Sequence, residues 1–120
     1  MKEYQLGEIE AKFAEIIWEN EPINSGDLVR LCEKELSWKK PTTYTVLRKL
    51  CERGLFQNEN ATVTALVKKN DFYARQSRQF IKDSFGGSLP KFLAAFSGGK
   101  RLTREEIDQL QRLIDEHKED

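Results

Sequence analysis

The chain has 120 residues, enough for one compact domain or for a small domain with an appendage. Its residues are 38% hydrophobic and 33% charged, as in ordinary soluble globular proteins. No apolar run approaches the length of a membrane span, and the first residues lack the plan of a signal peptide. We therefore expect a cytoplasmic protein without a membrane partner.

The formal net charge is zero, but the charges are distributed unevenly. Acidic residues dominate positions 1–38, whereas positions 39–53 are basic apart from Glu52 and carry Lys39, Lys40, Arg48, Lys49 and Arg53. Such a basic island concentrates the attraction for phosphate on one element. Taken alone, the charge pattern supports a solvated helix face equally well.

Three helices are predicted in the first half of the chain. The first covers roughly residues 7–20, and Glu21-Pro22 ends it because proline disfavours helix at the residue before it. The second is capped by Asn24 or Ser25 and extends to about Leu36. The third begins at Pro41, which suits a first helical position, and ends near Gly54, where a left-handed residue is expected.

The third helix has two different faces. The apolar stripe at helical spacing consists of Val46, Leu47, Leu50 and Cys51. The other side carries Thr42, Thr45, Arg48 and Lys49, with Lys39 and Lys40 just ahead of the first turn. A short helix with hydroxyl groups and basic side chains on its open face suits the major groove of duplex DNA.

The hydrophobic period changes after Gly54. Residues 55–57 and the β-branched run 62–67 flank a polar segment, Asn58-Glu59-Asn60, and this pattern predicts a hairpin. Three helices followed by a hairpin is the order of a winged helix-turn-helix, whose third helix enters the major groove. The predicted fold is therefore mainly α, with a winged helix followed by a further helical region. Domains of this topology also serve as protein-interaction modules, so both functions stay open here.

The last fifty residues are predicted to form three helices separated by glycine pairs. They cover residues 71–85, residues 89–96, and a helix that begins at Thr103, where Glu106 completes a capping box. Such short helices cannot enclose a core of their own, so they either fold back on the first domain or pair with a second copy, which we favour. We therefore expect a winged-helix domain in 1–70 and a dimerisation domain in 71–120. The expected dimer contacts are Phe80, Leu89, Phe92, Leu93, Phe96, Ile107, Leu110, Leu113 and Ile114.

Catalytic and metal-binding patterns are missing from the sequence. The single histidine, His117, has no cysteine or serine partner near it, and the glycine pairs are hinges rather than nucleotide loops. Cys32 and Cys51 are isolated among apolar positions, which indicates reduced core residues. We therefore expect no enzymatic activity, no metal and no cofactor.

A spaced motif in the third helix provides a resemblance. Thr42, Thr45, Leu47, Leu50, Arg53 and Gly54 match the pattern T-[IV]-x-T-x-L-x-R-L-x-x-[KR]-G. Supporting pieces are Ile16-Ile17-Trp18, Trp38, and Leu102-Thr103 followed by Glu105-Glu106-Ile107. By these motifs the chain resembles, over nearly its whole length, the penicillinase and methicillin-resistance repressors, a family of β-lactamase regulators that also includes copper-responsive repressors.

The resemblance implies a homodimeric transcriptional repressor that binds double-stranded operators with a TACA/TGTA-like dyad and controls antibiotic-resistance genes. It also implies a sensor-linked protease as a partner, because many members are inactivated by cleavage in the dimerisation region. The matching position is Ala95-Phe96, where the best-known members have Asn before Phe. The chain also departs from the family at Thr43, at Lys49 and at the wing tip, which lacks Gly and Arg. Its C-terminus lacks the cysteine cluster of the copper-responsive branch.

The candidate DNA-binding residues follow from the third helix and its neighbours. Thr42 and Thr45 are expected at base edges. The lysine and arginine side chains are expected at phosphates or at a guanine edge. Tyr44 either reaches a phosphate or packs on helix two, and the start of helix two offers backbone N–H groups to a phosphate. The full set is Asn24, Ser25, Lys39, Lys40, Thr42, Thr43, Tyr44, Thr45, Arg48 and Lys49. The alternative function is a winged-helix protein-interaction module that does not bind DNA.

Overall fold

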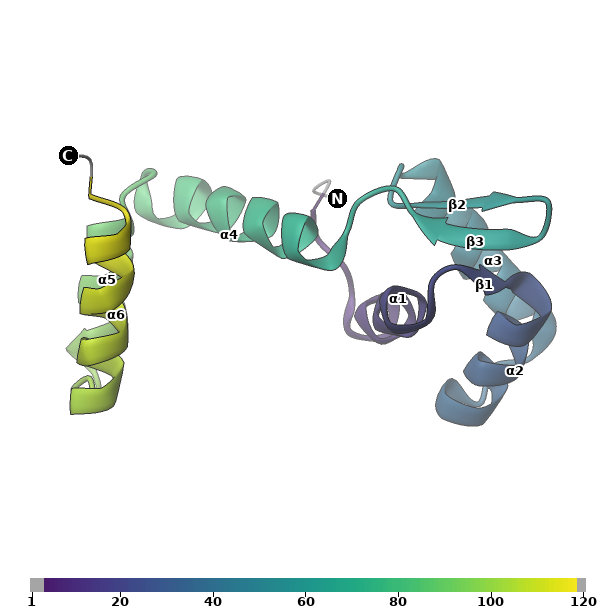
Figure 1. Cartoon of the computed structure of the whole chain (residues 1–120), viewed down its shortest axis with the longest axis horizontal. Coiled ribbons are helices and arrows are strands. Elements are labelled where there is room, and N and C mark those ends of the chain that lie inside the picture. The colour runs from purple at the N-terminus through teal and green to yellow at the C-terminus, as the bar shows by residue number, and fades with distance from the viewer. Residues whose placement is uncertain (1–3, 119–120) are drawn as a thin grey trace. The chain divides into compact units, whose positions relative to one another are not determined.

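The structure is a computed structural model that describes residues 4–118. Its elements, in chain order, are α1 (Glu8–Asn20), β1 (Ile23–Asn24), α2 (Ser25–Leu36), α3 (Lys40–Glu52), β2 (Phe56–Glu59), β3 (Thr62–Ala65), α4 (Lys69–Phe85), α5 (Leu89–Gly98) and α6 (Arg104–Glu116). Figure 1 shows this order along the chain. The predicted fold, a mainly helical protein with a winged helix followed by a helical region, is confirmed.

The helix starts follow from side-chain caps that the sequence encodes. The Asn24 side chain caps α2 by accepting a hydrogen bond from the Gly26 N–H at 2.8 Å. The capping box predicted at α6 is present, because Thr103 Oγ1 accepts from the Glu106 N–H at 3.0 Å and Glu106 Oε1 accepts from the Thr103 N–H at 2.8 Å. These caps satisfy amide groups that would otherwise have no partner within the helix.

The end of α3 is fixed by a glycine in the left-handed region. Gly54 has a φ of 80°, as predicted for this position. Its N–H donates to the Cys51 carbonyl at 2.9 Å, and the Leu55 N–H donates to the Leu50 carbonyl at 3.1 Å. These two bonds form a Schellman motif, which turns the chain from α3 directly into the hairpin.

A three-stranded antiparallel sheet forms the wing, in the order β1-β3-β2. The β2–β3 hairpin was predicted, and its register pairs Phe56 with Ala65. Its turn residues Asn60 and Ala61 have φ values of 53° and 61°, and a two-residue type I′ loop requires this positive φ at both positions. The sequence pattern did not indicate β1, because this strand has only two residues.

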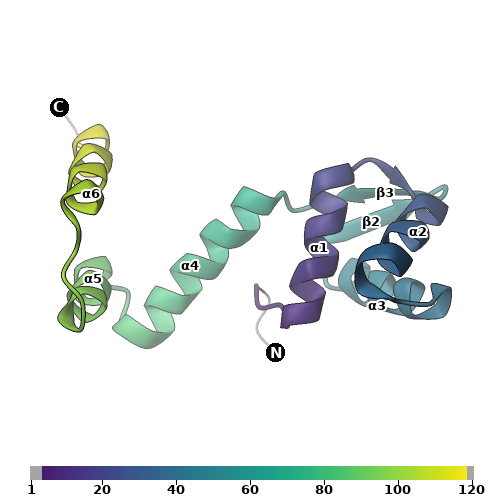
Figure 2. The same cartoon turned by 90° about the horizontal axis from the view of Figure 1, so that it is seen from below.

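One core holds α1, α2, α3, the wing and the start of α4 together (Figure 2). Its largest fully buried side chains include Phe13, Phe56 and Phe72, and each such burial stabilises the fold by about 1.5–3 kcal/mol. Trp18 packs on Phe56 and Phe72, with ring centroids 5.7 and 5.6 Å apart. Because Phe72 belongs to α4, the first unit extends past the expected boundary at residue 70 into this helix.

The chain divides into two compact units, and the division falls between Gln79 and Phe80, inside α4. The second unit contains the end of α4 with α5 and α6. A group of phenylalanines joins its elements: Phe85 and Phe92 lie 5.5 Å apart between ring centroids, and Phe80 lies 6.1 Å from Phe92. Among the residues described in this unit, none is fully buried.

Candidate nucleic-acid interface

Helix α3 places one face in the core and leaves the other open. Thr43, Leu47 and Leu50 are buried, whereas Thr42, Thr45 and Arg48 are exposed. At 3.6 residues per turn, the exposed residues lie along the side of the helix opposite the buried stripe. The structure therefore brings Thr42, Thr45 and Arg48 together on one accessible surface, which we call the open face of α3.

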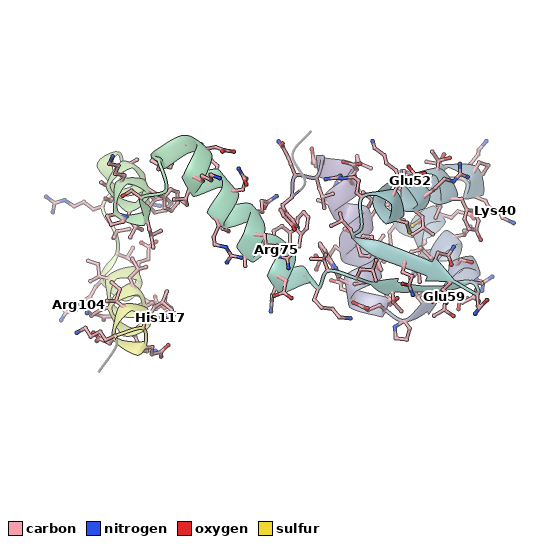
Figure 3. All side chains as sticks on the ribbon, turned by 90° about the horizontal axis from the view of Figure 1, so that it is seen from above. Lys40, Glu52, Glu59, Arg75, Arg104 and His117 are labelled. Atoms are coloured by element: carbon pink, nitrogen blue, oxygen red, sulfur yellow. The ribbon has the colours of Figure 1, made fainter. Side chains whose placement is uncertain are left out.

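The start of α3 is positively charged. Lys39 is the N-cap residue, and the first turn, Lys40-Pro41-Thr42, contains no acidic residue. Positive side chains at a helix N-terminus are unfavourable, because the helix dipole already places partial positive charge there. Such an arrangement suits an anion, which would interact with the lysines and the dipole together. Figure 3 shows Lys40 and Glu52, which mark the two ends of the helix.

The hydroxyl of Thr45 is already engaged as a donor. It donates to the Pro41 carbonyl at 2.9 Å, a bond within the same helix. The oxygen lone pairs and the methyl group are what Thr45 can still offer to a ligand. In a DNA groove these groups match an amino donor on a base or the methyl group of thymine.

Lys49 lies at the edge of the open face nearest to α1. Its Nζ is 3.5 Å from Oε2 of Glu10, whose Oε1 also accepts a hydrogen bond from the Gly7 N–H at 3.0 Å. That backbone hydrogen bond, aided by the charge of Lys49, lowers the pKa of Glu10 below its ordinary value. A phosphate at Lys49 therefore competes with a carboxylate that is ionised at neutral pH.

Arg53, the last basic residue of the island, lies on the same side of α3 as Lys49. Its Nη2 donates to the Gln5 carbonyl at 2.8 Å, a bond to the segment before α1. The basic island noted in the sequence is thus divided into two parts. Lys49 and Arg53 interact with α1 and its leading segment, and Lys49 is nevertheless exposed, as are Lys39, Lys40 and Arg48.

Thr43 is fully buried, so it does not belong to the open face. Its Oγ1 is buried without a hydrogen-bond partner among the residues that the structure describes. Burial also raises the pKa of the Cys32 thiol of α2 to about 11. The place of Thr43 in the predicted set of DNA contacts does not fit its burial, and we leave it out of the proposed surface.

The start of α2 uses its polar groups internally. Ser25 is buried, and its N–H donates to the Ala61 carbonyl at 2.8 Å. The Gly26 N–H donates to the Asn24 side chain. The expectation that this helix start offers free backbone N–H groups to a phosphate therefore does not fit the structure at Ser25 and Gly26. Asn24 itself is exposed.

Tyr44 points toward α2. Its hydroxyl donates to Ser25 Oγ at 3.2 Å, and its side chain is half-buried beside the core. Of the two roles that the sequence left open for Tyr44, packing on helix two is the one that the structure contains.

The wing has an acidic tip. Residues 56–65 contain no lysine or arginine, and Glu59 is their single charged residue. The carboxylate of Glu59 accepts a hydrogen bond from Gln57 Nε2 at 2.8 Å and is exposed on the hairpin (Figure 3). A negative charge here repels a nearby phosphate backbone.

The second unit exposes a large apolar surface. Six large apolar side chains are 50–56% exposed: Phe80, Leu89, Phe96, Ile107, Leu113 and Ile114. Phe92, Leu93 and Leu110, which were also predicted at a dimer contact, line a groove between α5 and α6 together with Phe96 and Leu113. Ala95 and Phe96, the candidate cleavage position, both lie on the surface of α5.

The structure also bears on metals, thiols and membranes. Within residues 4–118, no group of three His, Cys, Asp or Glu side chains is arranged to hold a metal ion. Cys32 and Cys51 are both free. None of the helices in this part of the chain combines the length and the apolar character needed to cross a membrane.

Comparison with known proteins gives a consistent result. The model of the penicillinase repressor family matches residues 6–116. The penicillinase repressor of Bacillus licheniformis is 24% identical over 118 residues, which are 95% of this chain and 92% of that protein. The methicillin resistance regulatory protein MecI of Staphylococcus aureus (strain Mu50 / ATCC 700699) is 21% identical over 117 residues, covering 94% of this chain and 95% of that protein. MecI of Mammaliicoccus sciuri is 20% identical over the same length.

Proposed function

The chain belongs to the penicillinase repressor family, and from this premise we propose that it is a homodimeric transcriptional repressor that binds a dyad operator in duplex DNA. The observation that carries the proposal is the open face of α3, where Thr42, Thr45 and Arg48 stand exposed above a buried stripe. A helix anchored in this way presents a fixed row of polar side chains, which is what reading a major groove requires.

The proposed contacts divide into two kinds. Thr42 and Thr45 meet base edges and supply sequence preference, with Arg48 the best candidate for a guanine edge. Lys39 and Lys40 contact phosphates beside the helix start, and they make binding salt-dependent without selecting a sequence. Lys49 serves as a further phosphate contact only where DNA displaces its interaction with Glu10.

The second unit is proposed to hold two copies of the chain together. Its exposed apolar side chains need a partner, and a second copy supplies a complementary surface through two-fold symmetry. Two recognition helices spaced about 34 Å apart would then meet two half-sites of one operator. In this arrangement the part of residues 71–120 that lies in the second unit, from Phe80 onward, acts as the dimerisation domain, and the start of α4 belongs to the core of the winged helix.

Release of the operator is proposed to follow cleavage by a sensor-linked protease at Ala95-Phe96. Both residues lie within α5, where the backbone is helical. Proteases bind their substrates in an extended form, so α5 must unwind locally before this bond can be cut. Cleavage there would divide the group of phenylalanines that joins the elements of the second unit.

Binding to a TACA/TGTA dyad duplex and to a scrambled duplex, at two salt concentrations and with the oligomeric state recorded, tests the proposal. We expect a dimer that binds the dyad more tightly and loses affinity for both duplexes as salt rises. The acidic tip of the wing favours the competing function, a module that binds protein only. Equal binding to the two duplexes without salt dependence would support that function instead.

A further inference from the structure

Three elements of the winged helix meet at one residue, Ser25. Its Oγ accepts a hydrogen bond from the Tyr44 hydroxyl of α3 at 3.2 Å, and its N–H donates to the carbonyl of Ala61 in the wing turn at 2.8 Å. Ser25 itself is the first residue of α2 and is only 7% exposed. The recognition helix and the wing turn are therefore both hydrogen-bonded to the same buried residue.

The hydroxyl of Ser25 is not needed to start its own helix. Asn24 occupies the N-cap position of α2, and its side chain accepts the Gly26 N–H. A serine at a helix start usually contributes as the N-cap residue. Here the cap is already supplied, and the Ser25 hydroxyl is directed to Tyr44 instead.

The wing reaches Ser25 through an unusual turn residue. Ala61 has a φ of 61°, a left-handed conformation that is unfavourable for a residue with a Cβ atom. The turn nevertheless places its carbonyl against the Ser25 N–H, next to the strand pair that joins Asn24 to Thr62. Strained backbone of this kind persists where the surrounding structure holds it.

We propose that Ser25 is a positioning residue that fixes the orientation of α3 relative to the wing, and that Tyr44 acts through Ser25 and not on DNA. This inference rests on the proposed function, because an orientation matters to a helix that must match a groove. Tyr44 directly precedes Thr45, so a rotation of α3 that breaks the Tyr44 bond also moves the Thr45 side chain across the open face.

The test uses three variants of the full chain: Tyr44→Phe, Ser25→Ala and the two combined. Affinities for the dyad and scrambled duplexes give a dyad preference for each protein. We expect each single substitution to reduce the preference by about 2- to 10-fold, the effect of one hydrogen bond, through weaker dyad binding. Because both remove the same bond, the double variant should lose no more than either single one.

Two matched controls separate positioning from general damage. Ser77→Ala removes a serine hydroxyl that donates to the Tyr73 carbonyl on α4, and Tyr73→Phe removes a tyrosine hydroxyl beside the core. Both should leave the dyad preference unchanged. Thermal unfolding of all variants checks that the fold is intact. We expect Ser25→Ala to remain folded, because Asn24 still caps α2.

Three outcomes overturn the inference but leave the proposed function in place. If Tyr44→Phe weakens binding to both duplexes equally while Ser25→Ala has no effect on binding, Tyr44 contacts a phosphate directly. If the losses of the two single variants multiply in the double variant, the residues act independently. If the wild type prefers the dyad and every variant keeps that preference, the positioning role alone is wrong. A wild type without any preference overturns the proposed function, and the positioning role with it.

Discussion

Lys49 Nζ lies 3.5 Å from Oε2 of Glu10, so α3 is linked by charge to the first turn of α1. The same carboxylate accepts the Gly7 N–H and completes the cap of α1. Glu10 therefore serves two elements at once, while its side chain stays largely shielded from solvent. Protonation of this one group should weaken both the cap and the link to α3.

The stability of the first unit should depend on pH through Glu10. Its pKa is lowered in the folded chain, first by the hydrogen bond from Gly7 and then by the charge of Lys49. A lowered pKa means that the stabilisation is present above the ordinary value of 4.5 and is lost as pH falls below it. Denaturant unfolding at several pH values should show wild type more stable than Glu10→Gln near pH 6, with the difference shrinking toward pH 3.

Glu33→Gln provides the control for this pH series, because Glu33 is an exposed carboxylate on α2. Its unfolding free energy should follow that of the wild type across the whole range. A difference between wild type and Glu10→Gln that stays constant with pH would show that packing, and not ionisation, accounts for the role of Glu10.

Thr45→Ala and Lys40→Ala should affect DNA binding in different ways. Thr45→Ala removes a group that we propose lies at a base edge, so we expect the preference for the dyad over a scrambled duplex to fall about 5-fold, or about 1 kcal/mol. Lys40→Ala removes a proposed phosphate contact, so both duplexes should bind more weakly by the same factor. The slope of log affinity against log salt should also decrease by about one. Affinity titrations at three salt concentrations measure both quantities, and equal losses on the two duplexes for Thr45→Ala would exclude base reading.

Glu59→Lys should strengthen binding to any duplex. The substitution replaces the single acidic side chain of the wing with a positively charged lysine, so repulsion of the DNA phosphate backbone becomes attraction. We expect affinity for the dyad and scrambled duplexes to increase together, with a steeper salt dependence. Glu116→Lys makes the same charge change at the end of α6 and serves as the control. If the two variants behave alike, net charge explains the gain and the wing does not approach DNA.

Much of the fold could be predicted from local patterns. The caps at Asn24 and Thr103 and the left-handed Gly54 each depend on residues close in sequence, and all three are present in the structure. The buried position of Thr43 also had a local signal, because Thr43, Leu47 and Leu50 follow the i, i+4, i+7 spacing of an apolar stripe. A threonine at such a position belongs to the core even when its neighbours face solvent.

The details of the candidate site could not be predicted in this way. Lys49 meets Glu10 and Tyr44 meets Ser25 across different helices, and no periodic pattern encodes such pairs. Both contacts arise from how α3 rests on α1 and α2. They distinguish Lys49 and Tyr44, which interact with other helices of the fold, from Thr42 and Arg48 on the open face.

Dimerisation through the second unit can be tested at Leu113, an apolar side chain that is 52% exposed on α6. Leu113→Asp places a charge where we propose that two copies meet, and burying an unpaired charge is costly, so the dimer dissociation constant should rise at least about 10-fold. Sedimentation across a concentration series measures it. Leu66→Asp makes the same change at a side chain that is 56% exposed in the first unit, and it should leave the dimer intact. Dyad binding should weaken with Leu113→Asp alone, because each separated winged helix then meets only one half-site; equal dimerisation of both variants would place the contact elsewhere.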